Sequence, residues 1–340
     1  MTTALSGIKP TGTLHLGNYL GMIRPALALA QRSERALYFI ADHHALNQLR
    51  DAVALRRLTL DVAATLLALG LDPARTLLYR QSDVPETFEL ATILAAVTPK
   101  GVANRAHAYK AAVAANESAG RPADDGVNLG LYTYPILMAA DILVMEAGVV
   151  PVGRDQVQHV EIARDVAAAF NGLFGQTLRP PAASIDPAVE VIAGLDGRKM
   201  SKSYGNVIPM FASGAELRRL VARIRTDSRR PEEPKDAERC LVFALYRQFA
   251  TVAEREAMRA RYAAGGLAYA EAKACLADAI DRELGLARAR YQELRPDEDG
   301  LQRALGEGAA RARAVASPTL ARVRRAIGTG PRLSLTTAAL

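Results

Sequence analysis

The chain has 340 residues and a mass of 36.4 kDa, and 50% of its residues are hydrophobic and 23% charged. This composition supplies enough apolar material for a buried core, so it excludes intrinsic disorder as the main state, and the length favours two domains over one. The formal net charge of +7 is compatible with a polyanionic partner, although solubility alone also explains an excess of this size. The excess lies entirely in residues 211–340, because basic and acidic residues balance in 1–150 and in 151–210.

Cysteine usage and hydropathy indicate the compartment. The two cysteines, Cys240 and Cys275, lie far apart, and the chain contains no C-x-x-C motif. This pattern excludes a disulfide framework and a thiolate zinc site, and it favours a reducing environment. The chain begins without a basic segment followed by an apolar one, and it contains no apolar stretch of about 18 residues. We therefore expect a cytoplasmic protein that does not span a membrane.

The N-terminal part alternates short apolar runs with helical patterns. Apolar runs at 4–8, 37–40 and 77–79 predict strands. Apolar residues at helical spacing predict helices over 16–31 and 52–69, between these strands. Alternation of this kind predicts an α/β fold with a doubly wound parallel sheet.

A helical insertion follows the third predicted strand. Residues 86–115 have helical patterns that are interrupted at Pro99–Gly101, and residues 118–125 predict an exposed loop. A further helix is predicted over 130–146, so the insertion covers about residues 86–145.

The predicted sheet resumes after this insertion. Residues 149–152 predict a buried strand, and a helix is predicted from about residue 156 to residue 170. The segment from there to Gly205 is rich in Pro and Gly, which predicts a loop.

The pattern changes again after Ser213. Ala, Arg, Glu and Leu dominate, β-branched runs disappear, and four or five amphipathic helices are predicted up to residue 327. We therefore predict two domains, residues 1–210 and residues 211–340. The C-terminal residues 308–340 contain six arginines and no acidic residue, and the helical ones are expected to meet nucleic-acid phosphates: Arg311, Arg313, Arg322, Arg324, Arg325 and Arg332.

The first segment with chemical potential is ALSGIKPTGTLHLGNY, residues 4–19. A strand runs into a turn containing Gly7, Pro10 and Gly12, and a helix starts near Leu16. Unpaired backbone N–H groups at such a helix start favour an anion, and a glycine at position 17 lets a planar ligand approach the backbone. The chain contains no Walker P-loop motif. Alone, the segment fits an ordinary glycine-rich turn as well as a nucleotide site.

The second segment is GLDGRKMSKS, residues 194–203, followed by Tyr204, Gly205 and Asn206. Two lysines three positions apart, two hydroxyl side chains and flanking glycines suit a mobile loop that holds a triphosphate. A solvated basic loop is the alternative. Chance is a poor explanation for both segments occurring in this order on either side of an α/β pattern.

These two segments resemble the signatures of class I aminoacyl-tRNA synthetases: HLGN at 15–18 is similar to the first, and KMSKS at 199–203 matches the second letter for letter. Residues 132–143 and 151–165 resemble the specificity helix and the nucleotide-contacting turn of the bacterial tryptophanyl-tRNA synthetase family. The similarity runs from about Leu5 to about Ile327. The tyrosyl family usually differs in both of these segments and in the lysine-containing loop that corresponds to KMSKS.

The middle helix supports this resemblance on physical grounds. Tyr134, Leu137, Met138 and Asp141 follow helical spacing and share one face. A carboxylate among apolar side chains needs a hydrogen-bond donor, and an indole N–H supplies one while its rings fill the apolar space. For a lone aspartate, helix N-termini or a serine would be the more usual partners.

The resemblance implies a Rossmann-like catalytic domain in residues 1–210 and a helical, anticodon-binding domain in 211–340. It implies activation of L-tryptophan by ATP and transfer to tRNA(Trp), with Mg²⁺ held mainly by the nucleotide rather than by the protein. It also implies a homodimer and gives no reason to expect DNA as a partner. The residues that it makes catalytic are His15, Lys199 and Lys202.

The resemblance also implies two sets of binding residues. Those assigned to ATP are Lys9, Pro10, Thr11, Gly17, Asn18, Lys110, Gly153, Arg154, Asp155, Ile192, Lys199, Met200, Ser201, Lys202 and Ser203. Those assigned to tryptophan are Leu5, His44, Tyr134, Met138, Asp141, Val150, Val152 and Gln156. His43 next to His44 is expected to be structural, because adjacent side chains point in different directions.

Three residues depart from the pattern of the family. Lys9 stands where many members have Gln, Leu5 replaces an aromatic residue of the pocket wall, and His15 replaces a common Thr. None of them removes a group that the chemistry needs. Two alternatives stay open: a nucleotidyltransferase that uses no tRNA, and a synthetase paralogue that adenylates but does not charge tRNA.

Overall fold

The centre of the molecule is a five-stranded parallel sheet in the order β3-β2-β1-β4-β5. The structure, a computed structural model, describes residues 3–153, 157–184 and 191–330. The strand order reverses between β1 and β4, so the predicted doubly wound α/β fold is confirmed. The strands are β1 (Thr3–Ile8), β2 (Arg35–Ile40), β3 (Thr76–Arg80), β4 (Val149–Pro151) and β5 (Ala182–Ser184).

Both faces of this sheet are buried, as the continuous apolar runs of the strands require. Along β2, Tyr38 and Ile40 face one hydrophobic cluster, whereas Leu37 and Phe39 face the other. This alternation follows from the two-residue repeat of a strand, and helices on both faces are the usual cover for a parallel sheet.

The helices of the N-terminal half begin and end close to the predicted positions. Asp51 caps one of them by accepting hydrogen bonds from the N–H groups of Val53 and Ala54, at 2.9 and 3.0 Å. The helix predicted over 16–31 is formed by three consecutive elements, of which the middle one is a π-helical turn. The elements are α1 (Leu16–Asn18), η1 (Tyr19–Ile23), α2 (Arg24–Arg32), α3 (Asp42–Ala45), α4 (Ala52–Ala68) and the 3₁₀ turn η2 (Gln81–Asp83).

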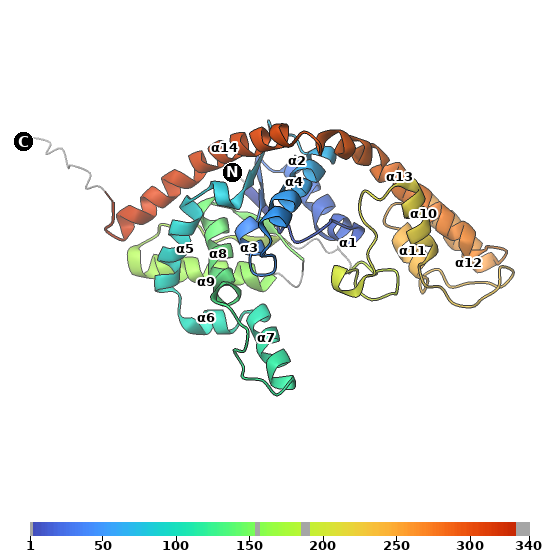
Figure 1. Ribbon diagram of the computed structural model, residues 1–340, viewed down its shortest axis with the longest axis horizontal. Coiled ribbons are helices and arrows are strands. Elements are labelled where there is room, and N and C mark those ends of the chain that lie inside the picture. Colours follow the sequence, from blue (N-terminus) through green and yellow to red (C-terminus); the bar gives the residue numbers. More distant parts are fainter. Residues whose placement is uncertain (1–2, 154–156, 185–190, 331–340) are drawn as a thin grey trace, which may run out of the picture.

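The predicted insertion is helical, and its first and last helices pack against α9 (Val157–Phe174). The chain breaks between the first two inserted helices at Pro99, as expected, and Asn128 starts the last one by accepting the N–H of Leu131 at 2.8 Å. One inserted helix, α7, projects from the body of the molecule (Figure 1). The inserted helices are α5 (Glu86–Val97), α6 (Lys100–Asn104), α7 (His107–Ser118) and α8 (Leu129–Val144).

One strand departs from the sequence prediction. The segment before Gly205 was expected to be a loop, but Ala182–Ser184 forms the edge strand β5 and pairs with Val149–Pro151. Its three small residues carry no β-branched or alternating signal. Backbone hydrogen bonds to β4 stabilise the strand in place of side-chain packing.

The C-terminal part forms five helices within residues 191–330, in agreement with the predicted four or five. Its core is continuous with one face of the sheet, since Tyr38, Leu217, Phe243 and Leu284 belong to one apolar cluster. The helices are α10 (Gly214–Ala222), α11 (Leu241–Tyr246), α12 (Val252–Ala264), α13 (Tyr269–Leu294) and α14 (Glu298–Ala326), and the 3₁₀ turn η4 (Lys202–Tyr204) precedes them.

The last helix, α14, returns across the molecule (Figure 1), and it packs against the edge strand β3. The approach is so close that a Cβ on Gly308 would lie 1.8 Å from the carbonyl oxygen of Leu78. Covering an edge strand in this way blocks pairing with another chain. The helix therefore links the end of the C-terminal part to the sheet.

The arginines of α14 contribute to this packing, a role that the sequence did not indicate. Four of the arginines expected to meet tRNA phosphates also bind groups of this chain. The ion pairs are Arg313–Glu86, Arg322–Glu146 and Arg324–Glu89, and Arg311 donates to the carbonyl oxygens of Pro73 and Ala74. Sequence alone could not show this, because the carboxylates lie more than 170 positions away along the chain. Within the described ranges, no helix is both long and apolar enough to cross a membrane.

Candidate active site

The turn after β1 and the lysine loop, defined here as residues 194–206, lie side by side. The chain that leaves the loop pairs with the chain that enters α1: the N–H of Leu16 donates to the carbonyl of Ile208 at 2.9 Å, and the N–H of Met210 donates to that of Leu14 at 3.0 Å. The two segments singled out by sequence, almost 200 positions apart, therefore form one site at the carboxyl end of β1.

Glycines make the contact between these segments possible. Gly12 has φ +135°, and a Cβ there would lie 2.9 Å from the Lys202 ammonium nitrogen. The N–H of Gly17 donates to the Met200 sulfur at 3.2 Å. Desolvation beside this turn lowers the pKa of Lys202 below its usual value. The turn thus holds a partly dehydrated ammonium next to backbone N–H groups, which is an arrangement suited to a phosphate group.

His15 stands at the start of α1 and is 6% exposed. Burial, together with the charge of Lys202, lowers the pKa of the imidazole to about 4, so His15 is neutral near pH 7. No hydrogen-bond partner within the described part of the chain reaches its Nδ1 atom. Because a buried polar atom normally has a partner, the orphaned nitrogen indicates that a polar substrate group completes this site.

The neutral state of His15 leads to a prediction for its titration. In ¹³C-histidine-labelled protein, we expect the His15 signal, assigned with a His15→Asn variant, to titrate near pH 4. The unfolded chain binds this proton near pH 6.5, so the site lowers stability progressively as the pH falls from 6.5 towards 4. Lys202→Ala removes the positive charge that, after burial, is the second cause of the lowered pKa, so this variant should raise the pKa of His15. A midpoint of about 6.5 in the parent protein would contradict the burial of the imidazole.

Other residues assigned to ATP belong to this turn or to the start of α1 that follows it. Pro10 is buried, and the N–H of Thr11 donates to the carbonyl of Lys9 at 3.0 Å. Asn18 accepts the N–H of His15 at 3.2 Å, and desolvation lowers the pKa of Lys9. A cation beside the turn adds to its preference for an anion.

The lysine loop is tied back on itself. The N–H of Met200 donates to the carbonyl of the buried Ile192 at 2.8 Å, and the hydroxyls of Ser201 and Ser203 are 2.9 Å apart. Lys199 and Lys202 both lie at the exposed side of this loop. Of the residues assigned to the second signature, Met200 and Lys202 contact the turn, at Gly17 and Gly12.

Some predicted ATP contacts are not gathered at this turn. Gly153 follows β4, at the point where the strand order reverses. Arg154, Asp155 and Gln156, which come next, lie outside the described residues. Lys110 is exposed on α7, which projects from the body of the molecule (Figure 1). The structure does not place this lysine with Lys199 and Lys202.

Asp141 on α8 is the centre of the second half of the site. The carboxylate is 3% exposed and accepts a hydrogen bond from the Gln81 amide at 2.9 Å, and the His44 Nε2 atom lies 2.9 Å away. Burial raises the pKa of Asp141, while the His44 and Gln81 contacts oppose this shift. The donors are neither helix N-termini nor a serine, the alternatives that sequence left open.

The ends of β2 and β3 hold these two donors in position. Asp42 accepts the N–H and the hydroxyl of Ser82, and the Gln81 side-chain oxygen accepts the N–H of His43 at 3.2 Å. The His43 ring is exposed and packs on Phe88, whereas the His44 ring is buried beside Asp141. Two neighbouring strand ends thus orient Gln81 and His44 toward one carboxylate.

Apolar side chains surround this polar cluster. Leu5 and Val150 are buried on neighbouring strands, and Met138 and Val152 pack against the same apolar cluster. The Tyr134 ring lies edge-on to His44, at 6.3 Å between centroids, and its hydroxyl is hydrogen-bonded to the His159 ring. A flat apolar ligand with one N–H donor matches these surroundings.

Sequence reasoning missed Gln81 and His159. Gln81 directly follows the third strand, and a polar residue at the carboxyl end of a parallel strand is a signal that could have identified it. His159 lies on α9, and nothing in its sequence surroundings indicates a contact with Tyr134. That contact exists because α8 and α9 pack against each other.

The sheet order, the turn after β1 with Gly12 and Gly17, and the lysine loop together define a class I aminoacyl-tRNA synthetase. Residues 1–285 match the family model described as tRNA synthetases class I (W and Y), and the chain belongs to this family. Within this family, the relatives that match nearly the whole chain are named tryptophan–tRNA ligases.

Three of these relatives illustrate the similarity. The protein from Pseudomonas aeruginosa is 51% identical, over 96% of this chain and 74% of its own length. That from Neisseria meningitidis serogroup A is 48% identical, over 96% of this chain and 98% of its own length. The crystal structure of tryptophanyl-tRNA synthetase from Campylobacter jejuni complexed with ADP and tryptophan is 38% identical, with a TM-score of 0.86 over 96% of this chain and 100% of that one.

Proposed function

We propose that the chain is a tryptophan–tRNA ligase, which activates L-tryptophan with ATP and transfers it to tRNA(Trp). The observation that carries the proposal is a pair of subsites. One is the turn at Gly12 and Gly17, which suits a phosphate group and contacts the lysine loop, and the other is the buried Asp141 carboxylate among apolar side chains. The relatives that span nearly the whole chain carry this activity in their names.

The first step joins the tryptophan carboxylate to the α-phosphate of ATP and releases pyrophosphate. Catalysis of this type depends on positioning and on neutralising charge rather than on a side-chain nucleophile. Lys199 and Lys202 supply positive charge beside the phosphates. His15, being neutral, donates or accepts a hydrogen bond there without adding charge. In the second step, the terminal ribose hydroxyl of the tRNA attacks the carbonyl of the adenylate and takes the acyl group, and AMP leaves.

Mg²⁺ accompanies the nucleotide in this proposal. Within the described residues there is no cluster of three or more His, Cys, Asp or Glu side chains that would hold a metal ion. The protein groups present are cations and backbone N–H groups, which suit phosphate oxygens rather than a metal. Mg²⁺ would therefore be bound mainly by the triphosphate, whose charge it partly neutralises.

Tryptophan recognition is assigned to the cluster on α8. The indole N–H would donate to Asp141, whose other hydrogen bonds come from this chain, while Met138 and its apolar neighbours contact the rings. Tyr134, together with Gln156, is proposed to bind the amino or carboxylate group. Phenylalanine would leave the carboxylate without its partner, so the site should reject it strongly.

The partners of the chain follow from the same assignment. The helical residues 211–330 are proposed to bind the anticodon arm through basic side chains that are not engaged with the sheet, and exposed Arg325 is one of them. A homodimer is proposed, formed through the inserted helices of residues 86–145. We place the enzyme in the cytoplasm, where tRNA is charged.

The test of the function compares two reactions of the purified protein. Pyrophosphate exchange is measured with tryptophan, with tyrosine and with no amino acid, and charging is measured with purified tRNA(Trp). We expect exchange with tryptophan only, together with charging. Exchange with tyrosine would replace the specificity by that of a tyrosyl enzyme. Exchange without charging would identify an adenylating paralogue.

A further inference from the structure

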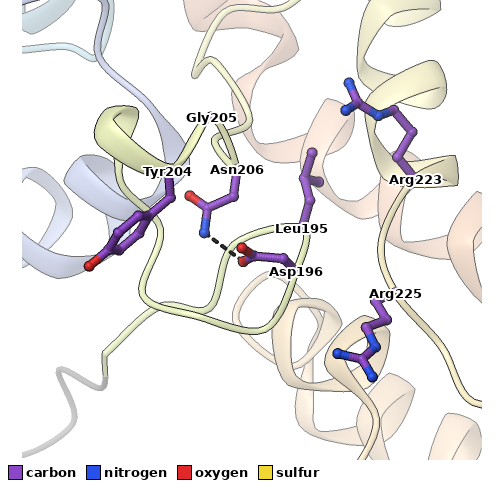
Figure 2. A pocket seen from close by; sticks show the side chains of 7 residues that line it. All are labelled: Leu195, Asp196, Tyr204, Gly205, Asn206, Arg223 and Arg225. Carbon is purple, nitrogen blue, oxygen red and sulfur yellow. Dashed lines mark hydrogen bonds between the residues drawn. The ribbon is translucent and has the colours of Figure 1, made fainter.

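The lysine loop carries Lys199 and Lys202, and its buried Leu195 and Met200 anchor it in the apolar core. A cavity of about 310 Å³ lies between part of the loop and the side chains of Arg223 and Arg225 (Figure 2), while the backbone N–H of Arg225 donates to the carbonyl of Leu195 at 2.9 Å. Asp196 and Asn206 line that cavity from the side of the loop. Between these anchors, the positions of the backbone groups depend on polar contacts within the loop as well as on packing.

Asn206 makes these contacts with a side chain that is 3% exposed. Its Oδ1 atom accepts the N–H of Ser201 at 2.9 Å. Its Nδ2 atom donates to the carbonyl of Lys199 at 3.1 Å and to the Asp196 carboxylate at 2.6 Å. Both amide N–H groups face acceptors and the amide oxygen faces a donor, so the orientation of the carboxamide follows from its partners.

The backbone of Asn206 completes the arrangement. Its carbonyl accepts the N–H of Leu195 at 3.0 Å. A Cβ on Gly194 would lie 2.4 Å from the Asn206 side chain, so only a glycine leaves room for it. One residue thus joins the start, the middle and the end of the lysine loop.

Asp196 is the acceptor that completes this network. Besides the Asn206 amide, it accepts the backbone N–H of Arg198 at 3.1 Å and the guanidinium Nε–H of the same residue at 2.6 Å. These contacts lower the pKa of Asp196 to about 2, so the carboxylate is charged throughout the working range of the enzyme. A charged acceptor strengthens the hydrogen bond from the carboxamide.

We propose that Asn206 is a positioning residue for adenylate formation: its carboxamide, anchored on Asp196, holds the backbone from Lys199 to Ser201. This inference rests on the proposed function. These hydrogen bonds lie on either side of Met200, whose sulfur contacts Gly17. They therefore determine the positions of the backbone atoms that carry the lysine side chains, relative to the turn after β1. Asn206 itself does not touch the reacting atoms.

A swap of the two interacting groups tests the proposal. Asn206→Asp removes both donated hydrogen bonds and places two carboxylates against each other, so the loop should move away from its working position. Asp196→Asn in the same chain supplies an amide that donates to the new carboxylate. We expect N206D to lower the single-turnover rate of adenylate formation at least about tenfold, and the double variant to recover at least about fivefold of this loss.

Asn171 provides the matched control. It is also buried, and its carboxamide also ties a turn, donating to the carbonyl of Leu178 at 2.8 Å and accepting its N–H at 2.9 Å. Asn171→Asp should leave the rate of adenylate formation within about twofold of the parent at a temperature where all variants are folded. The affinity for tryptophan should be unchanged in every variant, because the loop lies outside that pocket.

Two results would overturn the proposal: a rate for N206D within about twofold of the parent, or a double variant no faster than N206D. The second result would assign the loss to general damage. A failure of the proposed function is recognised separately, because the parent protein would then show no tryptophan-dependent pyrophosphate exchange.

Discussion

Replacing Lys202 with alanine is expected to lower the rate of tryptophanyl-adenylate formation at least about tenfold and to leave tryptophan affinity nearly unchanged. The Lys202 ammonium lies against Gly12, in the turn where backbone N–H groups and His15 converge. It is partly desolvated, so its attraction for a phosphate is less screened than that of a surface lysine. Charge that develops on the phosphates during the step would lose this support.

The measurement is a rapid-quench assay of adenylate formation with saturating tryptophan and ATP. Lys100→Ala is the control, since Lys100 is an exposed lysine on α6, outside the turn, and its removal changes the net charge by the same amount. An unchanged rate constant in the Lys202 variant would remove this residue from the catalytic set. An effect on tryptophan affinity alone would instead place Lys202 at the amino-acid pocket.

Replacing Asp141 with alanine is expected to weaken tryptophan binding about tenfold to a hundredfold and to reduce the discrimination against phenylalanine. The substitution removes the acceptor for the indole N–H and leaves the buried amide of Gln81 and the His44 ring without their partner. Asp141→Asn keeps one acceptor oxygen, so its effect should be smaller. ATP binding in the absence of tryptophan should not change.

Tryptophan fluorescence measures this affinity directly, because the chain itself contains no tryptophan and the ligand is the only indole in solution. Pyrophosphate exchange with tryptophan and with phenylalanine gives the discrimination. The control is Asp299→Ala, which removes an exposed carboxylate on α14. Equal affinity of the Asp141→Ala variant and the parent would show that another group receives the indole N–H.

The strands and helices could be predicted where side-chain periodicity was strong. The runs of β1, β2 and β3 are apolar on both faces, and this property selects a buried parallel sheet in almost any context. β5 was missed because its residues are small and its pairing depends on the backbone of β4. Local pattern contains no information about such a strand, since its energy comes from a partner far away in sequence.

The candidate site divides in the same way. Its two glycine- and lysine-rich segments were visible because unusual residue types cluster within short stretches. Gln81 and Asn206 were not assigned roles, since a single amide side chain has no distinctive spacing. Their importance lies in what they contact: a carboxylate on α8 in one case and the backbone of the lysine loop in the other.

The charge of the chain shows most clearly what each level determines. Sequence alone placed the whole +7 excess in residues 211–340 and identified the residue types that hold phosphates and an indole. Tertiary structure decided which groups those charges pair with, because α14 returns to the sheet and four of its arginines bind carboxylates and carbonyls of the N-terminal half. The reason is physical: composition and periodicity describe neighbours along the chain, whereas the pairing of a charge depends on neighbours in space.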